Sequence, residues 1–297
     1  MKILLLGKSG QVGWELQRAL APLGELITVG RSGPGPVADF AQPESLASLV
    51  RALQPTAIVN AAAHTAVDKA ESEPELARAV NADAPAVLAR EAATIGAWLL
   101  HYSTDYVFDG SGTVPWTESA ATGPLSVYGR SKLAGEEAIR ESGCRHLIFR
   151  TSWVYAARGG NFAKTMLRLA KERERLSVVA DQIGAPTGAD LLADVVAHAL
   201  RTAAQRGDVS GTYHAAASGE TSWHGYASHV IGFARAAGVP IKVAADAIDA
   251  VPSSEFKKPA RRPQNSRLDC SRLRHTFGLT MPAWQTGVDR MLAEVLG

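Results

Sequence analysis

The sequence predicts an α/β protein, built on a doubly wound parallel sheet with a smaller, interleaved C-terminal domain. Three observations support this prediction. Short apolar runs alternate with helical stretches through the N-terminal half, as in sheets that carry helices on both faces. A glycine-rich turn separates the first apolar run from the first helical stretch. The length of 297 residues suits about two domains, and no flexible linker divides the chain.

The N-terminal half is expected to supply the sheet. Continuous apolar runs are typical of parallel strands that are buried on both faces. Expected strands cover residues 3–6, 26–29, 57–60, 98–102 and 146–150. Helical spacing of apolar residues predicts helices over 14–23, 43–53 and 74–95.

The pattern loosens beyond Trp153. Apolar spacing predicts helices over 162–175, 191–201 and 221–237, and residues 253–265 form a basic loop punctuated by prolines. We therefore expect one domain over residues 1–152 and a second made mostly of residues 153–297. We also expect the chain to return to the first domain near residues 176–200 and to add strand and helix there.

The composition is that of an ordinary globular protein, with 46% hydrophobic and 20% charged residues. The net charge of +2 argues against a nucleic-acid polymer as partner, because such binding needs a strongly basic surface. No apolar stretch approaches the roughly 20 residues of a membrane span, and the first is too short for a signal peptide. Two cysteines, Cys144 and Cys270, cannot build a disulfide framework, which favours the reducing cytoplasm.

The glycine-rich turn is the first motif with a chemical meaning. Gly7, Gly10 and Gly13 stand three residues apart, after an expected strand and before an expected helix. Glycines let the backbone approach a diphosphate, and the helix N-terminus offers it unpaired N–H groups. The spacing alone is weak evidence, but its place in the chain favours a dinucleotide cofactor in a Rossmann-type domain over a turn without a ligand.

The end of the second expected strand bears on the choice between NADP and NAD. An acid at this place would bind the ribose 2′-hydroxyl of NAD, but the chain has Gly30, Arg31 and Ser32. An arginine pairs well with a 2′-phosphate, so the sequence favours NADPH or the use of both cofactors. The alternative is a solvated loop arginine. Asp39 and Phe40 are weaker candidates for contacts to the adenine.

Tyr128 and Lys132 form the sharpest chemical pattern. They stand four residues apart on an expected helix and so share one face. A phenol has a pKa near 10 and carries protons poorly at neutral pH unless a nearby cation stabilises its phenolate. Lys132 supplies that charge, and Thr104, at the edge of the sheet, would bond the same substrate oxygen. Such pairs also arise by chance on helices, but the upstream motifs favour catalysis.

Other residues are weaker candidates. Arg261 and Arg262 either grip a diphosphate or belong to a solvated charge run. Trp153 either covers an apolar face of a sugar or packs in the core. We interpret His64 as a structural or loop histidine, because it has no carboxylate or cysteine partner at metal-ligand spacing, and His101 as a core histidine, because it stands within an apolar strand. No metal-binding motif is predicted from spacing.

Together these motifs resemble those of an extended short-chain dehydrogenase/reductase, and longer strings resemble the dTDP-4-dehydrorhamnose reductase family. The strings are GKSGQVGWEL from Gly7, NAAAHTAVDKAE from Asn60, HYSTDYVF from His101, FRTSWVY from Phe149 and RRPQNSRL from Arg261. The similarity covers nearly the whole chain. It implies an oxidoreductase that reduces the 4-keto group of dTDP-4-dehydro-6-deoxy-L-mannose (dTDP-6-deoxy-L-lyxo-4-hexulose) with NADPH or NADH. This is the last step of dTDP-L-rhamnose biosynthesis, which serves lipopolysaccharide O-antigen.

The resemblance also implies roles for individual residues in a cofactor domain and a substrate domain. Tyr128 is the proton donor, Lys132 tunes it and holds the nicotinamide ribose, and Thr104 completes the triad. Expected cofactor contacts are Gly7, Gly10, Gln11, Val12, Gly13, Arg31, Asp39, Phe40, Ala63, His64, Thr65, Tyr102, Tyr128 and Lys132. Expected contacts with the dTDP-sugar are Thr104, Asp105, Tyr106, Trp153, Arg261 and Arg262.

The resemblance further implies a homodimer with Mg²⁺ at its contact, for which Glu15 and Asp190 are the matching carboxylates. Two other functions stay open. A non-catalytic, NADP-binding regulatory subunit can keep both Tyr128 and Lys132. A nucleotide-sugar epimerase or dehydratase shares the general motifs, but a dehydratase needs an acid–base pair after the active-site threonine, where this chain has the single acid Asp105.

Overall fold

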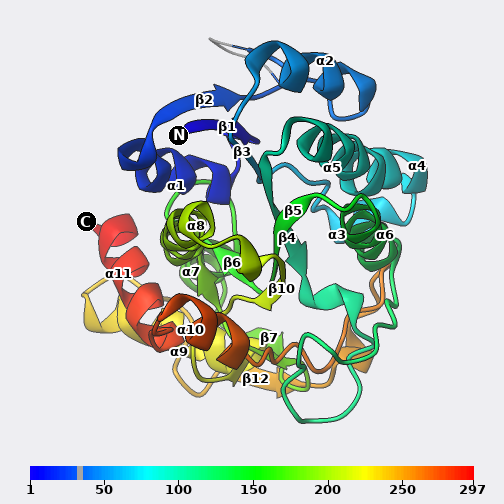
Figure 1. The fold of residues 1–297 in the computed structure, drawn as a ribbon. Coiled ribbons are helices and arrows are strands. Elements are labelled where there is room, and N and C mark those ends of the chain that lie inside the picture. Colours follow the sequence, from blue (N-terminus) through cyan, green and yellow to red (C-terminus); the bar gives the residue numbers. More distant parts are fainter. Residues whose placement is uncertain (32–35) are drawn as a thin grey trace.

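The computed structural model describes residues 1–31 and 36–297 and confirms the predicted α/β class. The central sheet has six strands in the order β10-β5-β4-β3-β1-β2, and every pair in it is parallel. Helices lie on both faces of this sheet (Figure 1). Its strands are β1 (Lys2–Leu6), β2 (Glu25–Val29), β3 (Ala57–Asn60), β4 (Trp98–Thr104), β5 (Arg145–Thr151) and β10 (Gly211–His214).

The two faces of the sheet bury separate apolar cores, and strand β1 shows why its residues are apolar throughout. Ile3 and Leu5 point to the core under α1 (Gln11–Leu20) and α8 (Ala189–Gln205). Leu4 and Leu6 point to the opposite core. A strand that is buried on both faces has no solvent-facing position, so apolar side chains predominate in it. The second core is covered by α2 (Glu44–Leu53), α5 (Ala84–Ile95) and α6 (Val127–Glu141).

The predicted strands of the N-terminal half are confirmed, and two differences matter for the site. Strand β4 runs two residues further than expected, so that Thr104 ends the strand. The helix expected over 74–95 is divided into α4 (Pro74–Arg78), a π-helical segment (Ala79–Asp83) and α5. Helix α1 begins at Gln11, directly after Gly10, and a 3₁₀ turn (Ala21–Leu23) follows it.

A third apolar core lies in the C-terminal half, between α7 (Phe162–Glu172), α9 (Trp223–Ala236) and α11 (Trp284–Leu296). The helices predicted over 162–175, 191–201 and 221–237 are confirmed as α7, α8 and α9. The remaining helices are α3 (Val67–Ala70) and α10 (Ser271–Phe277). Short strand pairs complete this half: β7 (Leu176–Val179) with β12 (Ile248–Val251), β6 (Val154–Tyr155) with β9 (Thr187–Gly188), and β8 (Ile183–Gly184) with β11 (Thr221–Ser222).

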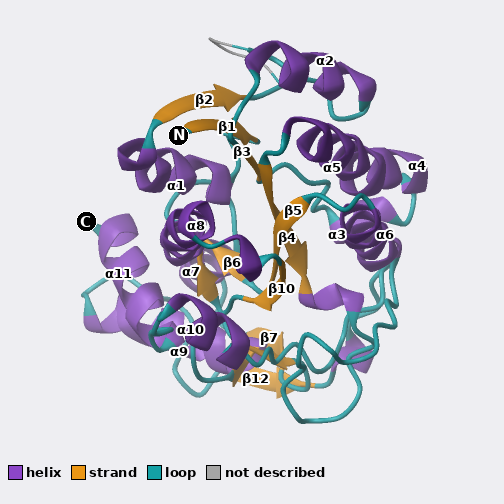
Figure 2. Cartoon of the chain, in the orientation of Figure 1, coloured by secondary structure: helices purple, strands orange, loops and turns teal. Residues whose placement is uncertain are grey.

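Two elements from the C-terminal half return to the central sheet. Helix α8 packs beside α1, and β10 pairs in parallel with β5 at the edge of the sheet. The pair of β7 and β12 lies apart from the central sheet, among long loops (Figure 2). Within the described ranges, the chain has no helix that is both long enough and apolar enough to cross a membrane.

Candidate active site

The glycine-rich turn lies at the carboxyl end of β1, where it packs closely against the backbone of its neighbours. Gly7 has a φ of +88°, and a Cβ there would lie 2.7 Å from the backbone nitrogen of Ala62. A Cβ on Gly13 would run into the carbonyl of Gly7, so helix α1 packs directly on the turn. Both glycines are therefore required by geometry. The N-terminus of α1 points at this edge, as a diphosphate needs.

Gln11 begins α1 and faces a loop of the C-terminal half. Its Nε2 donates to the carbonyl of Gly160 at 3.3 Å. Its Oε1 is buried and has no hydrogen-bond partner among the described residues. A buried polar atom without a partner is rare in folded proteins, and this amide oxygen suits a ligand group that donates, such as a ribose hydroxyl. The residues of the turn thus fit a dinucleotide.

The residues expected near the adenosine differ in exposure. Arg31 is exposed at the end of β2, whereas Ser32 lies outside the described residues. The exposed Asp39 accepts a hydrogen bond from the backbone N–H of Ala41 at 2.9 Å. Phe40 is 5% exposed and packs in the core between β1 and α2, which leaves little of its ring for a ligand.

The segment of Ala63, His64 and Thr65 follows β3 and is held by Asn81 of the π-helical segment. The backbone N–H of His64 donates to Asn81 Oδ1 at 2.8 Å, and Asn81 Nδ2 donates to the His64 carbonyl at 3.0 Å. The same Nδ2 donates to Ser131 Oγ on α6 at 3.0 Å. Asn81 therefore fixes the loop to helix α6. Sequence reasoning missed Asn81, because nothing in the pattern marks a π-helical insertion.

Tyr128 and Thr104 meet at the carboxyl end of the sheet. Helix α6 begins after Ser126, whose Oγ accepts the N–H of Gly129 at 3.1 Å, so Tyr128 lies in the first turn. Burial raises the pKa of Tyr128 to about 12, and a hydrogen bond with the Thr104 side chain opposes this rise. The ring of Tyr106 packs edge-on against Tyr128, with centroids 5.5 Å apart. The phenol therefore stays protonated at neutral pH.

Lys132 lies one turn further along α6 and is fully buried. Its Nζ donates to the carbonyl of Tyr102 at 2.6 Å and lies 3.0 Å from His101 Nε2. Burial lowers the pKa of Lys132 to about 8, and the charge of Glu136 opposes this. The Tyr102 hydroxyl donates to the carbonyl of Leu192 on α8 at 3.1 Å, so this side chain ties the strand to the helix.

Asp105 follows Thr104 and is also buried. Thr104 Oγ1 donates to Asp105 Oδ1 at 3.1 Å and accepts the backbone N–H of Tyr106 at 3.2 Å. Burial raises the pKa of Asp105 to about 6, and a hydrogen bond from Ser266 opposes this rise. Asp105 Oδ2 has no partner among the residues that the structure describes. The carboxyl group therefore has an oxygen available for a polar ligand.

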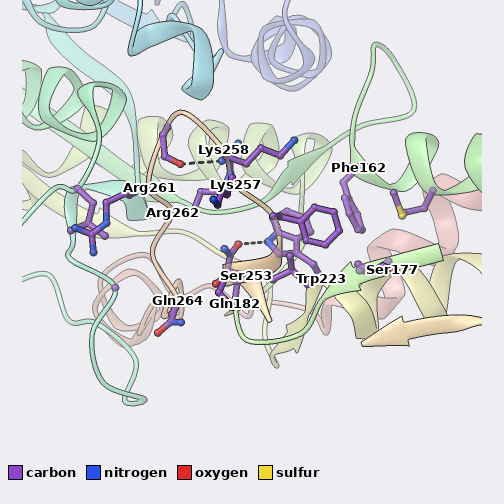
Figure 3. A pocket seen from close by; sticks show the side chains of 18 of the residues that line it. Phe162, Ser177, Gln182, Trp223, Ser253, Lys257, Lys258, Arg261, Arg262 and Gln264 are labelled. Carbon is purple, nitrogen blue, oxygen red and sulfur yellow. Dashed lines mark hydrogen bonds between the residues drawn. The ribbon is translucent and has the colours of Figure 1, made fainter. Parts of the chain in front are cut away.

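A cavity of about 1020 Å³ opens between the C-terminal loops. Its walls combine aromatic rings with cationic side chains, as Figure 3 shows for Phe162, Trp223 and the basic residues of the loop. Rings suit a base or sugar face, and cations suit a diphosphate. Among the residues that line the cavity, several were not predicted as site residues from the sequence, including Phe162, Gln182, Trp223, Lys257 and Lys258.

Trp153 does not line this cavity but supports its wall. Its ring stacks on Trp223 with centroids 3.7 Å apart and planes 15° from parallel. Trp223 Nε1 donates to Gln182 Oε1 at 3.1 Å, which fixes the ring further. Trp153 has a φ of +49°, a backbone conformation that costs a non-glycine residue energy and that tends to occur at functional sites.

The two arginines of the basic loop lie in different surroundings. Arg261 is exposed and lines the cavity. Arg262 also lines the cavity but donates to both carboxylate oxygens of Asp68 on α3, at 2.8 and 3.1 Å. This ion pair joins the C-terminal loop to helix α3. The structure therefore brings both arginines to the cavity, with Arg262 anchored and Arg261 exposed.

The expected carboxylates for Mg²⁺ gain no support. Glu15 lies 3.6 Å from Arg18, and Asp190 lies 3.6 Å from Arg290. Outside the undescribed residues 32–35, the chain has no group of three or more His, Cys, Asp or Glu side chains that could hold a metal ion.

Comparisons with known proteins agree with this geometry. The model of the RmlD substrate binding domain family matches residues 1–296. The dTDP-4-dehydrorhamnose reductase of Escherichia coli K12 is 58% identical over 295 residues, which cover 99% of this chain and 98% of that protein. The reductase of Burkholderia thailandensis is 47% identical and covers 100% of this chain, with 99% of its own length matched.

Solved structures with the same fold include two dTDP-4-dehydrorhamnose reductases. The Clostridium acetobutylicum structure superposes with a TM-score of 0.90 at 34% identity and covers 100% of both chains. The Bacillus anthracis structure, a complex with NADP, has a TM-score of 0.89 at 35% identity and covers 99% of this chain and 100% of its own.

Proposed function

We propose that this chain, which belongs to the dTDP-4-dehydrorhamnose reductase family, reduces the 4-keto group of dTDP-4-dehydro-6-deoxy-L-mannose to give dTDP-L-rhamnose. The reaction is the last step of dTDP-rhamnose biosynthesis. The observation that best supports the assignment is the Tyr128–Thr104 pair, which a hydrogen bond joins where strand β4 ends and helix α6 begins. A reduced nicotinamide, when bound, supplies the hydride for C4 of the sugar.

The chain's own residues bind the cofactor and orient it. The turn from Gly7 to Gly13 is where we propose that the diphosphate binds, at the N-terminus of α1. Gln11 Oε1 is the buried acceptor that a ligand hydroxyl would satisfy. Lys132 lies on the face of α6 that also carries Tyr128, where its amine can bond a ribose hydroxyl. We propose NADPH as the preferred cofactor, because Arg31 stands where an acid would select NAD.

Tyr128 acts as the proton donor in this proposal. Reduction of a ketone creates an alkoxide that needs a proton, and the buried phenol holds one at neutral pH. Thr104 orients the same oxygen through its hydroxyl. The raised pKa of Tyr128 suits a group that must be protonated before the reaction begins.

The cavity of the C-terminal loops is proposed to hold the dTDP-sugar. Arg262 lines it and bonds Tyr106, whose ring packs on Tyr128. Lys257, Lys258 and Arg261 supply positive charge for the diphosphate, and Trp223 and Phe162 supply flat apolar surface. Asp105 and Tyr106 lie next to Thr104 at the sugar end, and Trp153 holds the aromatic wall through its stack on Trp223.

The decisive experiment measures oxidation of NADPH, then NADH, on enzymatically made dTDP-4-keto sugar. The Tyr128→Phe variant should lose about 10²- to 10⁴-fold in kcat, as expected when a general acid is removed, while its Kd for NADPH stays within about twofold. Unchanged turnover in Tyr128→Phe would refute the role of the tyrosine. Stoichiometric NADPH consumption also excludes an epimerase, which needs no added reductant.

The regulatory-subunit alternative is tested by the same assay. A chain that binds NADP tightly but shows no turnover with the keto sugar would favour that alternative. The free thiols of Cys144 and Cys270 suit a reducing compartment, and we propose the cytoplasm. We also propose a homodimer, which sedimentation analysis can measure, and a cofactor domain over 1–152 with a mostly substrate-binding domain over 153–297.

A further inference from the structure

Arg262 lines the cavity, but its guanidinium group is already engaged by neighbouring residues. Its Nη1 and Nη2 donate to the two carboxylate oxygens of Asp68, at 3.1 and 2.8 Å. Nη1 also donates to the carbonyl of Ala260 at 3.2 Å, and a further hydrogen bond joins the group to the Tyr106 side chain. These contacts use most of the five N–H donors of an arginine, and the carboxylate balances its charge. Arg262 is therefore poorly suited to bind a diphosphate as well.

Tyr106 transmits this restraint to the first turn of α6. Its ring packs edge-on against the ring of Tyr128, with centroids 5.5 Å apart and planes 76° from parallel. Its backbone carbonyl lies against Gly129, because a Cβ on that glycine would run into the carbonyl oxygen. Both contacts are made beside the phenol of Tyr128. A displacement of Tyr106 would therefore displace or release the phenol.

The segment that carries Asp68 also holds the start of α6. Asp68 lies on α3, and Glu71 follows directly after this helix. Glu71 Oε1 accepts the backbone N–H of Val127, the first residue of α6, at 2.8 Å. Contacts therefore run from α3 through the basic loop and Tyr106 to α6, and from α6 back to α3. Arg262 is the member of this circuit that comes from the C-terminal half.

The loop around Arg262 is fixed, so its guanidinium group acts from a firm base. The backbone N–H of Ala260 donates to Asp68 Oδ1 at 3.3 Å. Beyond the arginine, the backbone N–H of Asn265 donates to the carbonyl of Gly110 at 3.0 Å. Arg261, by contrast, is exposed in the same cavity wall. The two adjacent arginines therefore differ in what they can bind.

We propose that Arg262 is a positioning residue, which holds Tyr106 against Tyr128 and leaves the charge of the diphosphate to Arg261 and the lysines of the basic loop. This inference rests on the proposed function, because it divides the work of the cations in that same site. Arg262 keeps the phenol in the place where the keto oxygen binds. Loss of Arg262 therefore slows proton donation and does not weaken substrate binding.

The first test reads the tyrosine rings in the full chain without cofactor or substrate. The protein is labelled with ring-¹³C-tyrosine, and Tyr106→Phe and Tyr128→Phe assign the signal that each of them lacks. Arg262→Gln should shift both signals, because each ring changes the magnetic environment of the other. Arg261→Gln should leave both in place. A Tyr128 signal that does not move in Arg262→Gln would overturn the proposal, and this result is distinct from failure of the reductase assignment, since no substrate is present.

The second test separates kcat from KM. Arg262→Gln should lower kcat by about tenfold or more and leave KM for the dTDP-sugar within about twofold, as expected when only the alignment of a reacting group is lost. Its Kd for dTDP, measured by calorimetry, should also stay within about twofold. Arg261→Gln should instead raise both KM and Kd. A raised KM with an unchanged kcat in Arg262→Gln would show that Arg262 binds the substrate, which contradicts the proposal.

Two further variants keep the test valid if Arg262→Gln folds poorly. Arg262→Lys retains the charge, but an ammonium group cannot reproduce the planar contacts with both Asp68 and Tyr106. Its kcat should fall as in Arg262→Gln, whereas a ligand of the diphosphate would tolerate lysine. Asp68→Asn lies outside the cavity wall and should lower kcat in the same direction, because the guanidinium group loses its anchor. Parental kcat values in both variants would overturn the proposal.

Arg206→Gln is the matched control. Arg206 donates to both carboxylate oxygens of Asp208, at 3.2 and 3.0 Å, just after α8, and it does not line the cavity. This variant loses a comparable ion pair and should leave kcat, KM and both tyrosine signals unchanged. If Arg206→Gln lowers kcat as much as Arg262→Gln does, the effect is one of general stability, and the positioning role is refuted.

Discussion

Arg31 is the residue that bears most on cofactor choice. It is exposed at the end of β2, where a 2′-phosphate can approach it without desolvating it first. We expect Arg31→Ala to raise KM for NADPH by about tenfold and to leave KM for NADH within about twofold, because a charge-assisted hydrogen bond contributes roughly 1.5–3 kcal/mol. Initial rates with each cofactor measure this. Equal effects on both cofactors would show that Arg31 does not read the 2′-phosphate.

Asp105 makes stability depend on pH in an unusual direction. Its pKa is raised from 3.8 to about 6 by burial, so the folded protein binds this proton more tightly than the unfolded chain does. Its contribution to stability is full below about pH 4 and is lost as the pH rises through 6. The free energy of unfolding of Asp105→Asn, taken relative to that of the parent, should therefore rise by about 2–3 kcal/mol when the pH is raised from about 4 to about 8.

Urea unfolding of both proteins at the two pH values measures this difference. Asp109→Asn is the control, because hydrogen bonds from Ser111 lower the pKa of Asp109 and its contribution has the opposite sign. The difference in unfolding free energy between Asp105→Asn and the parent should change with pH. If it does not, the pKa of Asp105 is not raised by burial.

Site residues that lie close together in the sequence could be predicted from their spacing. The four-residue spacing of Tyr128 and Lys132 predicted that they share one face of a helix, and the structure places both on α6. The stack of Trp153 on Trp223 joins residues from distant segments, and no spacing rule marks such a pair. His101 was interpreted as structural because it stands within an apolar strand, and its partners Asn60 and Lys132, which come from two other elements, were not predicted.

At the scale of elements, α6 depends on close contact with the π-helical segment. A Cβ on Gly135 would meet the backbone carbonyl of Asn81. Gly135→Ala should therefore destabilise the protein by about 1–3 kcal/mol through overpacking, although alanine is the better helix former. It should also lower kcat, because Asn81 holds the loop of His64 to the catalytic helix.

Gly232→Ala is the matched control, since it lies in α9 and a Cβ there has nothing within 4 Å. This variant should be stabilised by up to about 1 kcal/mol through helix propensity alone. Thermal unfolding of both variants measures the contrast. A stabilised Gly135→Ala would show that α6 can shift away from Asn81 at little cost.

Strands with continuous apolar sequences were predictable, and strands that carry polar residues were not. Apolar runs such as 3–6 and 57–60 are buried on both faces and leave a clear pattern. Strands β7 and β12 are four residues each and carry one polar side chain each, so they resemble loops. Strand β10 reads Gly-Thr-Tyr-His, and its place in the sheet comes from pairing with β5 rather than from its own composition.

For the whole molecule, the balanced net charge hides a local concentration of cations. The basic loop places Lys257, Lys258 and Arg261 on one wall of the cavity, in a chain whose net charge is only +2. The double variant Lys257→Ala/Lys258→Ala should raise KM for the dTDP-sugar about three- to tenfold with little change in kcat, because ground state and transition state share the diphosphate.

The salt dependence of KM checks the same idea. Exposed charges are screened within roughly 10 Å at about 0.1 M salt, so KM of the parent should rise with salt and that of the double variant should rise less. Lys171→Ala is a control on the same C-terminal half, because Lys171 is exposed on α7 and does not line the cavity. If KM rises equally with salt in all three proteins, the diphosphate does not bind beside Lys257 and Lys258.

The return of α8 and β10 to the central sheet also governs how the protein is made. While the ribosome is still producing residues before 189, strand β5 has an unpaired edge and the apolar side chains Phe149 and Leu147 lack the cover of α8 and Tyr213. The sheet can be completed only after residue 214 has left the exit tunnel. During this interval the nascent chain exposes apolar surface on an incomplete sheet. Such surface is prone to aggregation and is the kind that chaperones bind.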